Sequence, residues 1–115
     1  MASLARRVVE GGGIVVVGTD SPINPQGLAL LAEMQALVEY GRMRPVDVLR
    51  ATTSIAADAL GYGGELGAIR PGMLADLLVV GGDPLSDIRA LRDVRTVISD
   101  GRLFTLPELL ERPSA

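Results

Sequence analysis

A run of four β-branched residues at positions 14–17 (IVVV) constrains the fold more than any other stretch of this sequence. Three glycines precede the run and Gly18 follows it. A short, continuous apolar segment bounded by glycines is typical of a strand buried on both faces, as in parallel α/β sheets. A buried turn of helix is the competing interpretation, but β-branched side chains favour the strand. We therefore expect an α/β fold with a buried strand over residues 14–17.

Helical patterns flank this predicted strand. A short helix capped by Ser3 is expected near the N-terminus. Over residues 27–40, apolar side chains recur on one face at a spacing of 3.6 residues, which predicts a second helix. The segment 45–60 starts with a proline suited to the first turn of a helix. The run TTS at 52–54 predicts a break into two short helices, the second capped by Ser54.

The second half of the sequence indicates β structure. An apolar strand is expected over residues 75–80, and the Asp100–Gly101 pair between two strand-like segments is a hairpin signal. We interpret Asp76 as a structural carboxylate that accepts hydrogen bonds from backbone N–H groups. Asp83 precedes a proline and is interpreted as a turn residue. The tail beyond Pro107 predicts a short helix.

The composition excludes several classes of site. The 115 residues include no cysteine, no histidine and no lysine, and all 11 basic residues are arginines. Disulfides, thiolate metal sites, imidazole ligands and Schiff-base chemistry are therefore unavailable to this chain alone. A catalyst built from it would depend on carboxylates, hydroxyls and guanidinium groups.

Charge and hydropathy also narrow the range of partners and locations. The net charge is −3 and the arginines are scattered, so we expect no nucleic-acid partner. The longest apolar runs are far shorter than the ~20 residues that a membrane span requires, so we expect no membrane partner. No signal-peptide pattern opens the sequence, and by default we expect a cytoplasmic location.

Three segments, in order, carry a resemblance to a known family. They are GTDSPINPQGLALLAEMQALVEYG, RPVDVLRATTSIAADALG and GELGAIRPGMLADLLVVGGDPLSDI. Together they resemble the C-terminal part of metal-dependent amidohydrolases, in particular the imidazolonepropionase-like and Xaa-Pro-dipeptidase-like branch. The resemblance extends from about Arg6 to Phe104. The ordered set of segments is far more specific than the lone GTD motif.

The resemblance implies a fold and a division into domains. The chain would be the last strand and helices of a (β/α)₈ amidohydrolase barrel, followed by part of a small β-sandwich. Residues 1–62 would form the end of the barrel, with strand 14–17 and helices at about 27–40 and 45–60. Residues 63–106 would form the sandwich segment, and residues 107–115 the C-terminal tail. Such a chain is a fragment, not a complete barrel.

The resemblance also implies a role for Asp20. In the family, the aspartate that ends the eighth strand contacts a divalent metal, usually zinc, and handles the proton of the attacking water. Asp20 occupies the matching position, at the end of a strand where barrel enzymes place catalytic residues. Without the resemblance, we would interpret Asp20 as a turn residue, because Asp before Ser-Pro favours turns. Thr19, Ser21 and Asn24 are candidate substrate-binding residues, although loop formation explains them equally well.

Two hypotheses about function follow. The first is that the parent enzyme hydrolyses a C–N bond in a small cyclic amide or dipeptide-like substrate by metal-activated water. The family's other ligands are absent, so this chain alone should hold no cofactor and should be inactive. The second is a non-catalytic α/β module that self-associates as a homo-oligomer with exchanged elements. The reason is that the predicted strand 14–17 and the apolar face of the predicted helix 27–40 lack partners.

Overall fold

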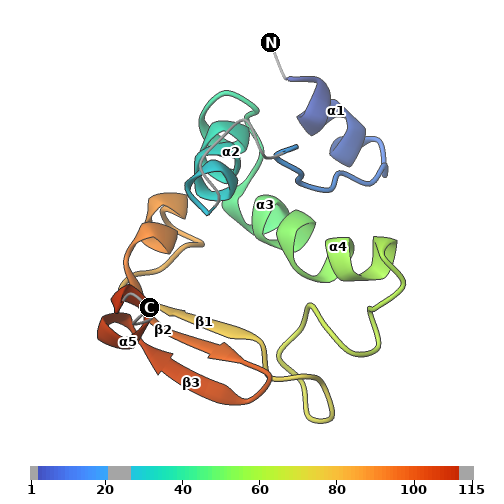
Figure 1. Ribbon diagram of the computed structural model, residues 1–115. Helices are drawn as coiled ribbons and strands as arrows, with labels where there is room; N and C mark the ends of the chain where they lie inside the picture. Colours follow the sequence, from blue (N-terminus) through green and yellow to red (C-terminus); the bar gives the residue numbers. More distant parts are fainter. Residues whose placement is uncertain (1–2, 21–26, 112–115) are drawn as a thin grey trace.

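A computed structural model of the chain describes residues 3–20 and 27–111 (Figure 1). Helices occupy the N-terminal half, and a sheet with two flanking short helices occupies the C-terminal half. In chain order the elements are α1 (Leu4–Glu10), α2 (Leu28–Glu39), α3 (Pro45–Thr52), α4 (Ser54–Ala59), β1 (Leu77–Val80), the 3₁₀ helix η1 (Ile88–Arg92), β2 (Val94–Ser99), β3 (Arg102–Thr105) and α5 (Leu106–Leu110).

The predicted buried strand over residues 14–17 is wrong for this structure. These residues are in neither helix nor strand, and they lie in an irregular segment beside α1 (Figure 1). Ile14 is 73% exposed and Val16 is 44% exposed, so the run is not buried on both faces. A strand exists only when a neighbouring strand pairs with it, and no strand in the described part of the chain pairs with this run.

The helical predictions are largely confirmed. Ser3 caps α1, since its side chain accepts a hydrogen bond from the Arg6 N–H. The helix expected over 27–40 is α2, and the break at 52–54 separates α3 from α4. The predicted capping role of Ser54 is wrong, because Ser54 is the first residue of α4 and Thr53 is its N-cap. The Thr53 hydroxyl donates to the Leu49 carbonyl of the preceding helix, so the side chain closes α3.

The hairpin prediction is confirmed. The sheet has the order β1-β2-β3 with antiparallel pairs, and Ser99 pairs with Arg102 across the two-residue turn. Asp100 and Gly101 both have positive φ, at 48° and 76°, as a type I′ turn requires. The first strand begins at Leu77, two residues later than expected. Asp76 is a structural carboxylate as predicted, since it accepts a 2.7 Å hydrogen bond from the Asp100 N–H.

The buried core joins the two halves of the chain. Met34 of α2, Met43, Val48 of α3, and Ile88 and Leu91 of η1 form one cluster. The 3₁₀ helix between β1 and β2 therefore packs against the helices, and Val80 of β1 packs against the same cluster. The fold is a small α/β arrangement with a three-stranded antiparallel sheet. None of the helices in the described ranges is long and apolar enough to cross a membrane.

Candidate functional site

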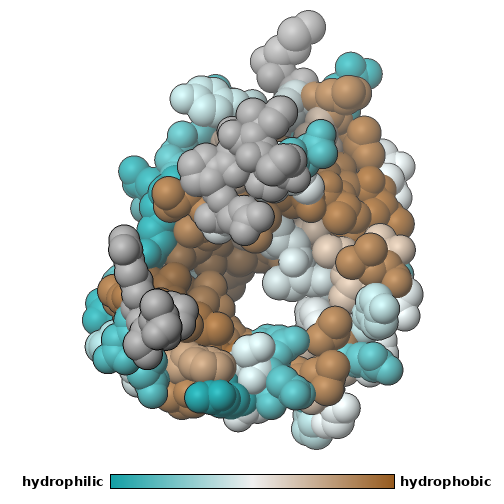
Figure 2. Space-filling view, viewed as in Figure 1, coloured by the Kyte–Doolittle hydropathy of each residue, from teal (hydrophilic) through white to brown (hydrophobic). Residues whose placement is uncertain are grey.

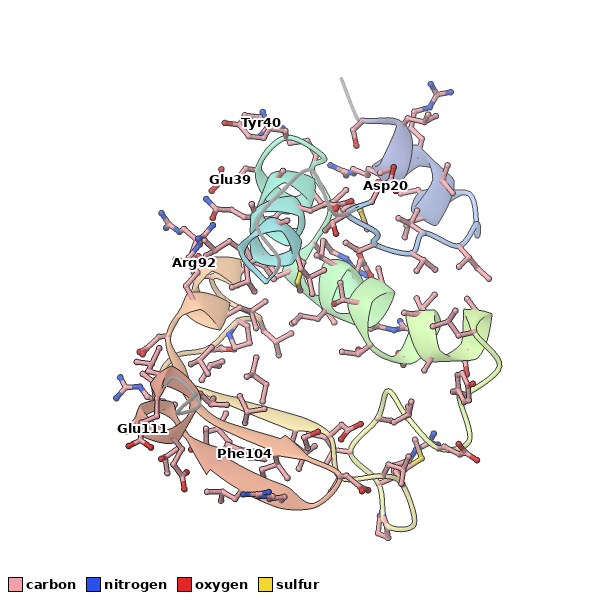
Figure 3. The ribbon with its side chains drawn as sticks, viewed as in Figure 1. Asp20, Glu39, Tyr40, Arg92, Phe104 and Glu111 are labelled. Atoms are coloured by element: carbon pink, nitrogen blue, oxygen red, sulfur yellow. The ribbon has the colours of Figure 1, made fainter. Side chains whose placement is uncertain are left out.

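The carboxylate of Asp20 lies at the helical end of the molecule. Figure 3 shows it near α1 and α2, far from Phe104 and Glu111 on the sheet side. Asp20 is exposed and adopts a φ of 48°, a left-handed conformation that aspartate tolerates better than most residues. Thr19 precedes it and is half-buried. This backbone geometry suits a turn, and it also leaves the carboxylate open to a partner.

The other two predicted substrate-binding residues, Ser21 and Asn24, lie outside the residues that the structure describes. Among the described residues, no arginine forms an ion pair with Asp20. The structure therefore brings Thr19 and Asp20 together by sequence adjacency alone.

The donor groups of this chain do not fit a complete metal site. Across residues 3–20 and 27–111, no group of three or more His, Cys, Asp or Glu side chains converges to hold a metal ion. Histidine and cysteine are absent from the whole sequence. A catalytic zinc takes three protein ligands and leaves one position for water, and Asp20 alone is one ligand.

The charged groups in the described residues form local ion pairs on the surface. A hollow of about 410 Å³ between α1 and the start of α3 is lined partly by Arg6, Glu10, Arg44 and Asp47. Arg6 pairs with Glu10 at 2.6 Å, and Arg44 holds both oxygens of Asp47 at 2.7 and 3.0 Å. The hydrogen bonds from Arg44 lower the pKa of Asp47. Two of the arginines that line the hollow are therefore already paired with carboxylates.

The turn carboxylates serve structural roles. Asp83 accepts hydrogen bonds from the Ser86 hydroxyl at 2.8 Å and from the Leu85 N–H at 2.9 Å, and these bonds lower its pKa. The interpretation of Asp83 as a turn residue is thereby confirmed. Asp87 accepts from the Arg89 side chain and backbone, which lowers its pKa in the same way. Neither group is placed for chemistry.

The sequence reasoning missed a large apolar cleft. It has a volume of about 490 Å³ and lies between α2, α3, the turn at 66–69 and strand β1. Leu31, Leu49 and Leu78 are among its lining residues. The signal that could have revealed it is β1 itself, because the unbroken run LLVV has no polar face to turn toward solvent.

Comparison with known proteins identifies the family to which this chain belongs. The sequence profile of the amidohydrolase family matches residues 2–104. The chain belongs to the amidohydrolase family.

Individual relatives agree with this assignment. The chain is 42% identical to imidazolonepropionase from Chloroflexus aggregans over 80 residues, which cover 69% of this chain and 19% of that enzyme. A crystal structure of a Xaa-Pro dipeptidase matches with a TM-score of 0.79 and 35% identity, covering 88% of this chain and 24% of the dipeptidase. Molinate hydrolase matches with a TM-score of 0.79 and 29% identity, covering 96% of this chain and 27% of that protein.

The relatives share a reaction class. They include imidazolonepropionases, deaminases and a dipeptidase, which are amidohydrolases that act on carbon–nitrogen bonds. The chain spans only about a fifth to a quarter of the length of the relatives it matches. The chemistry of a whole relative therefore involves many residues with no counterpart here.

Proposed function

We propose that this chain supplies the C-terminal end of a metal-dependent amidohydrolase that hydrolyses a C–N bond in a small cyclic amide or dipeptide-like substrate. In this proposal residues 1–62 complete a (β/α)₈ barrel, with 14–17 as its last strand. Residues 63–106 belong to a small sandwich domain, and 107–115 form the tail. The ordered match over residues 2–104 is the observation that carries the proposal.

The lack of a partner for residues 14–17 supports this assignment. These residues have the composition of a strand buried on both faces, yet Ile14 is 73% exposed. A parallel barrel would provide neighbouring strands on both sides and so remove this exposure. The composition of the segment therefore supports its assignment as a barrel strand.

Asp20 is the catalytic residue that this chain contributes. It follows the apolar run by three residues, where a carboxylate at the end of a barrel strand faces the pocket. Its role is to accept a proton from the attacking water, a task suited to an exposed carboxylate that forms no ion pair with a described residue. Thr19, Ser21 and Asn24 are proposed to contact the substrate from the same loop.

A divalent metal, with zinc as the first choice, would be held mainly by residues from outside this chain. Asp20 supplies one oxygen ligand, and the nitrogen ligands must come from polypeptide that contains histidine. The chain by itself is therefore proposed to be inactive.

A chimera tests this function. Residues 1–115 would replace the matching C-terminal quarter of the Xaa-Pro dipeptidase, and release of proline from a Xaa-Pro dipeptide would be measured. We expect activity that falls by about 10²–10⁴-fold on Asp20→Asn, the range for loss of a general base. Asp83→Asn, a change at a turn carboxylate, is the control and should leave the rate within a few-fold. A folded, active chimera that tolerates Asp20→Asn would refute the role of Asp20.

Self-association is the second candidate, and one observation favours it. Large apolar side chains are exposed in the described ranges, among them Leu60 at 73% and Ile69 at 86%. Such surface suits a protein that buries it against another polypeptide. In this reading the chain is a non-catalytic module that forms homo-oligomers.

A further inference from the structure

The hollow between α1 and the start of α3 gathers three arginines from three parts of the chain. Arg6 belongs to α1, Arg42 lies in the turn between α2 and α3, and Arg44 is the N-cap of α3. Two carboxylates, those of Glu10 and Asp47, line the same hollow. The described lining therefore has an excess of positive charge, whereas the whole chain has a net charge of −3. This local excess favours an anionic ligand.

Arg42 is the one arginine of this hollow that pairs with no carboxylate of the described residues. Its backbone φ is 55°, in the left-handed region. The other non-glycine residues with positive φ in the described ranges are Asp20 and Asp100, and aspartate tolerates this region better than arginine does. A residue held in a conformation that its side chain disfavours, beside a hollow, is typical of functional sites.

The turn that carries Arg42 is anchored on both sides. The Met43 N–H donates to the Leu37 carbonyl of α2 at 3.1 Å, and the Met43 side chain is part of the buried core. The Ser3 hydroxyl donates to the Gly41 carbonyl, which ties the turn to the start of α1. The backbone at this position is therefore fixed before any ligand binds, and this reduces the entropy lost on binding.

The two paired arginines retain donors for a further acceptor. Arg6 uses its Nε–H for Glu10 at 2.6 Å, and Arg44 uses Nε–H and Nη2–H groups for the two oxygens of Asp47. A guanidinium carries more N–H groups than these bonds occupy. Its planar shape matches the two oxygens of a carboxylate. Val9 adds an apolar side chain to the same lining, which suits a ligand with a short hydrocarbon part.

The charged lining distinguishes this hollow from the apolar cleft beside β1. Figure 2 shows the molecule hollowed between the helices and the sheet, with hydrophobic side chains gathered along the helical wall. Such an apolar wall suits cover by further polypeptide. In the arginine-lined hollow, by contrast, the side chains of Arg6, Glu10 and Arg44 are 48%, 54% and 76% exposed. Burial of these charges would remove their hydration, so we expect this hollow to stay open to small solutes.

We infer that the hollow binds a small organic carboxylate, with Arg42 as the principal anchor. Arg42 holds the two carboxylate oxygens, and Arg6 and Arg44 supply further N–H donors. Val9 contacts the hydrocarbon part of the ligand. A volume of about 410 Å³ lies within the range of small-molecule sites. This inference goes beyond the proposed function and requires no catalytic activity.

Titration of the isotope-labelled 115-residue chain with butyrate, followed by heteronuclear NMR, tests the inference. Chloride would keep the ionic strength constant. We expect saturable shifts of the Arg42, Met43 and Asp47 amide signals, with a dissociation constant on the order of millimolar. Inorganic phosphate is the second probe and should bind more weakly, because it has no hydrocarbon part. Absence of saturable shifts with butyrate would overturn the inference, and phosphate binding that is equally tight or tighter would overturn the assignment of a carboxylate.

Arg42→Gln and Arg102→Gln remove the same charge at two places, and Arg102 lies on β3 outside the hollow. We expect Arg42→Gln to raise the dissociation constant for butyrate by about tenfold or more, and Arg102→Gln to change it by less than about twofold. Equal effects of the two substitutions would indicate diffuse attraction to the net charge and refute the site.

Arg42→Gly separates binding from folding. It should weaken butyrate binding as Arg42→Gln does, yet raise the midpoint of thermal unfolding, because glycine adopts a φ of 55° without strain. A lower midpoint, or butyrate binding as tight as in the unmodified chain, would contradict the inference, since the Arg42 side chain would then serve the fold instead of a ligand.

Discussion

The substitution Val48→Ala tests whether the small cluster between α2, α3 and η1 holds the two halves of the chain together. Val48 is completely buried, and Met34, Met43, Ile88 and Leu91 form the cluster with it. The change removes two methyl-sized groups, each worth about 0.8 kcal/mol of transfer free energy. A cavity term adds to this loss, and the higher helix propensity of alanine offsets part of it. We expect a net destabilisation of about 2 kcal/mol.

Val46→Ala is the matched control. It makes the same change in the same helix, but Val46 is 37% exposed. We expect a loss of about 0.5 kcal/mol or less, because partial exposure reduces the transfer term, no cavity is left behind, and the gain in helix propensity offsets much of the remainder. The assay is urea unfolding followed by circular dichroism, at one protein concentration so that association contributes equally. If Val48→Ala were no more destabilising than Val46→Ala, the cluster would not be the core of this fold.

Three further predictions concern local structure. Ser3→Ala should destabilise α1 by about 1 kcal/mol through loss of its N-cap, and hydrogen exchange of the first helix should quicken; unchanged exchange would refute the cap. Gly101→Ala should cost about 1 kcal/mol because Gly101 has a φ of 76°, whereas Gly64→Ala, also in open space, should change stability by less than about 0.5 kcal/mol; equal effects in thermal unfolding would contradict this. The hydrogen bond from Ser86 lowers the folded-state pKa of Asp83 below its usual 3.8, so its contribution to stability is present above that pH and disappears as acid protonates the folded form. As the pH is lowered, the unfolding free energy should therefore decrease less steeply for Asp83→Asn than for the unmodified chain. Identical slopes would count against the hydrogen bond.

Local sequence signals predicted the elements that depend on neighbouring residues alone. The spacing of apolar residues located α2, and the Asp100–Gly101 pair located the hairpin, because only residues that accept positive φ fit a type I′ turn. The carboxylate of Asp76 was correctly assigned to a structural bond, although its partner lies 24 residues away.

Features that depend on distant partners could not be predicted in the same way. Residues 14–17 have the composition of a buried strand, but pairing is a property of two strands and the second is not in the described structure. The helix η1 was missed because a single 3₁₀ turn has no clear periodic signal. Its side chains Ile88 and Leu91 are nevertheless part of the buried core of the described residues.

The candidate site shows the same limit. Asp20 was found through the resemblance of its surroundings to a family, and family membership is confirmed by the match over residues 2–104. Its catalytic role stays a prediction, because the groups that would act with it are not among the described residues. One carboxylate on an exposed turn does not by itself distinguish a catalyst from a turn residue.

Hydrolysis by the isolated chain is the measurement that tests the central claim most directly. The purified 115-residue protein would be assayed with Xaa-Pro dipeptides in the presence of added Zn²⁺ or Mn²⁺, alongside the Asp20→Asn variant. We predict no turnover above the background of metal alone for either protein, because the nitrogen ligands of the proposed centre are absent from this sequence. Turnover by the unmodified chain that Asp20→Asn abolishes would contradict the account, since this polypeptide would then contain a complete catalytic centre.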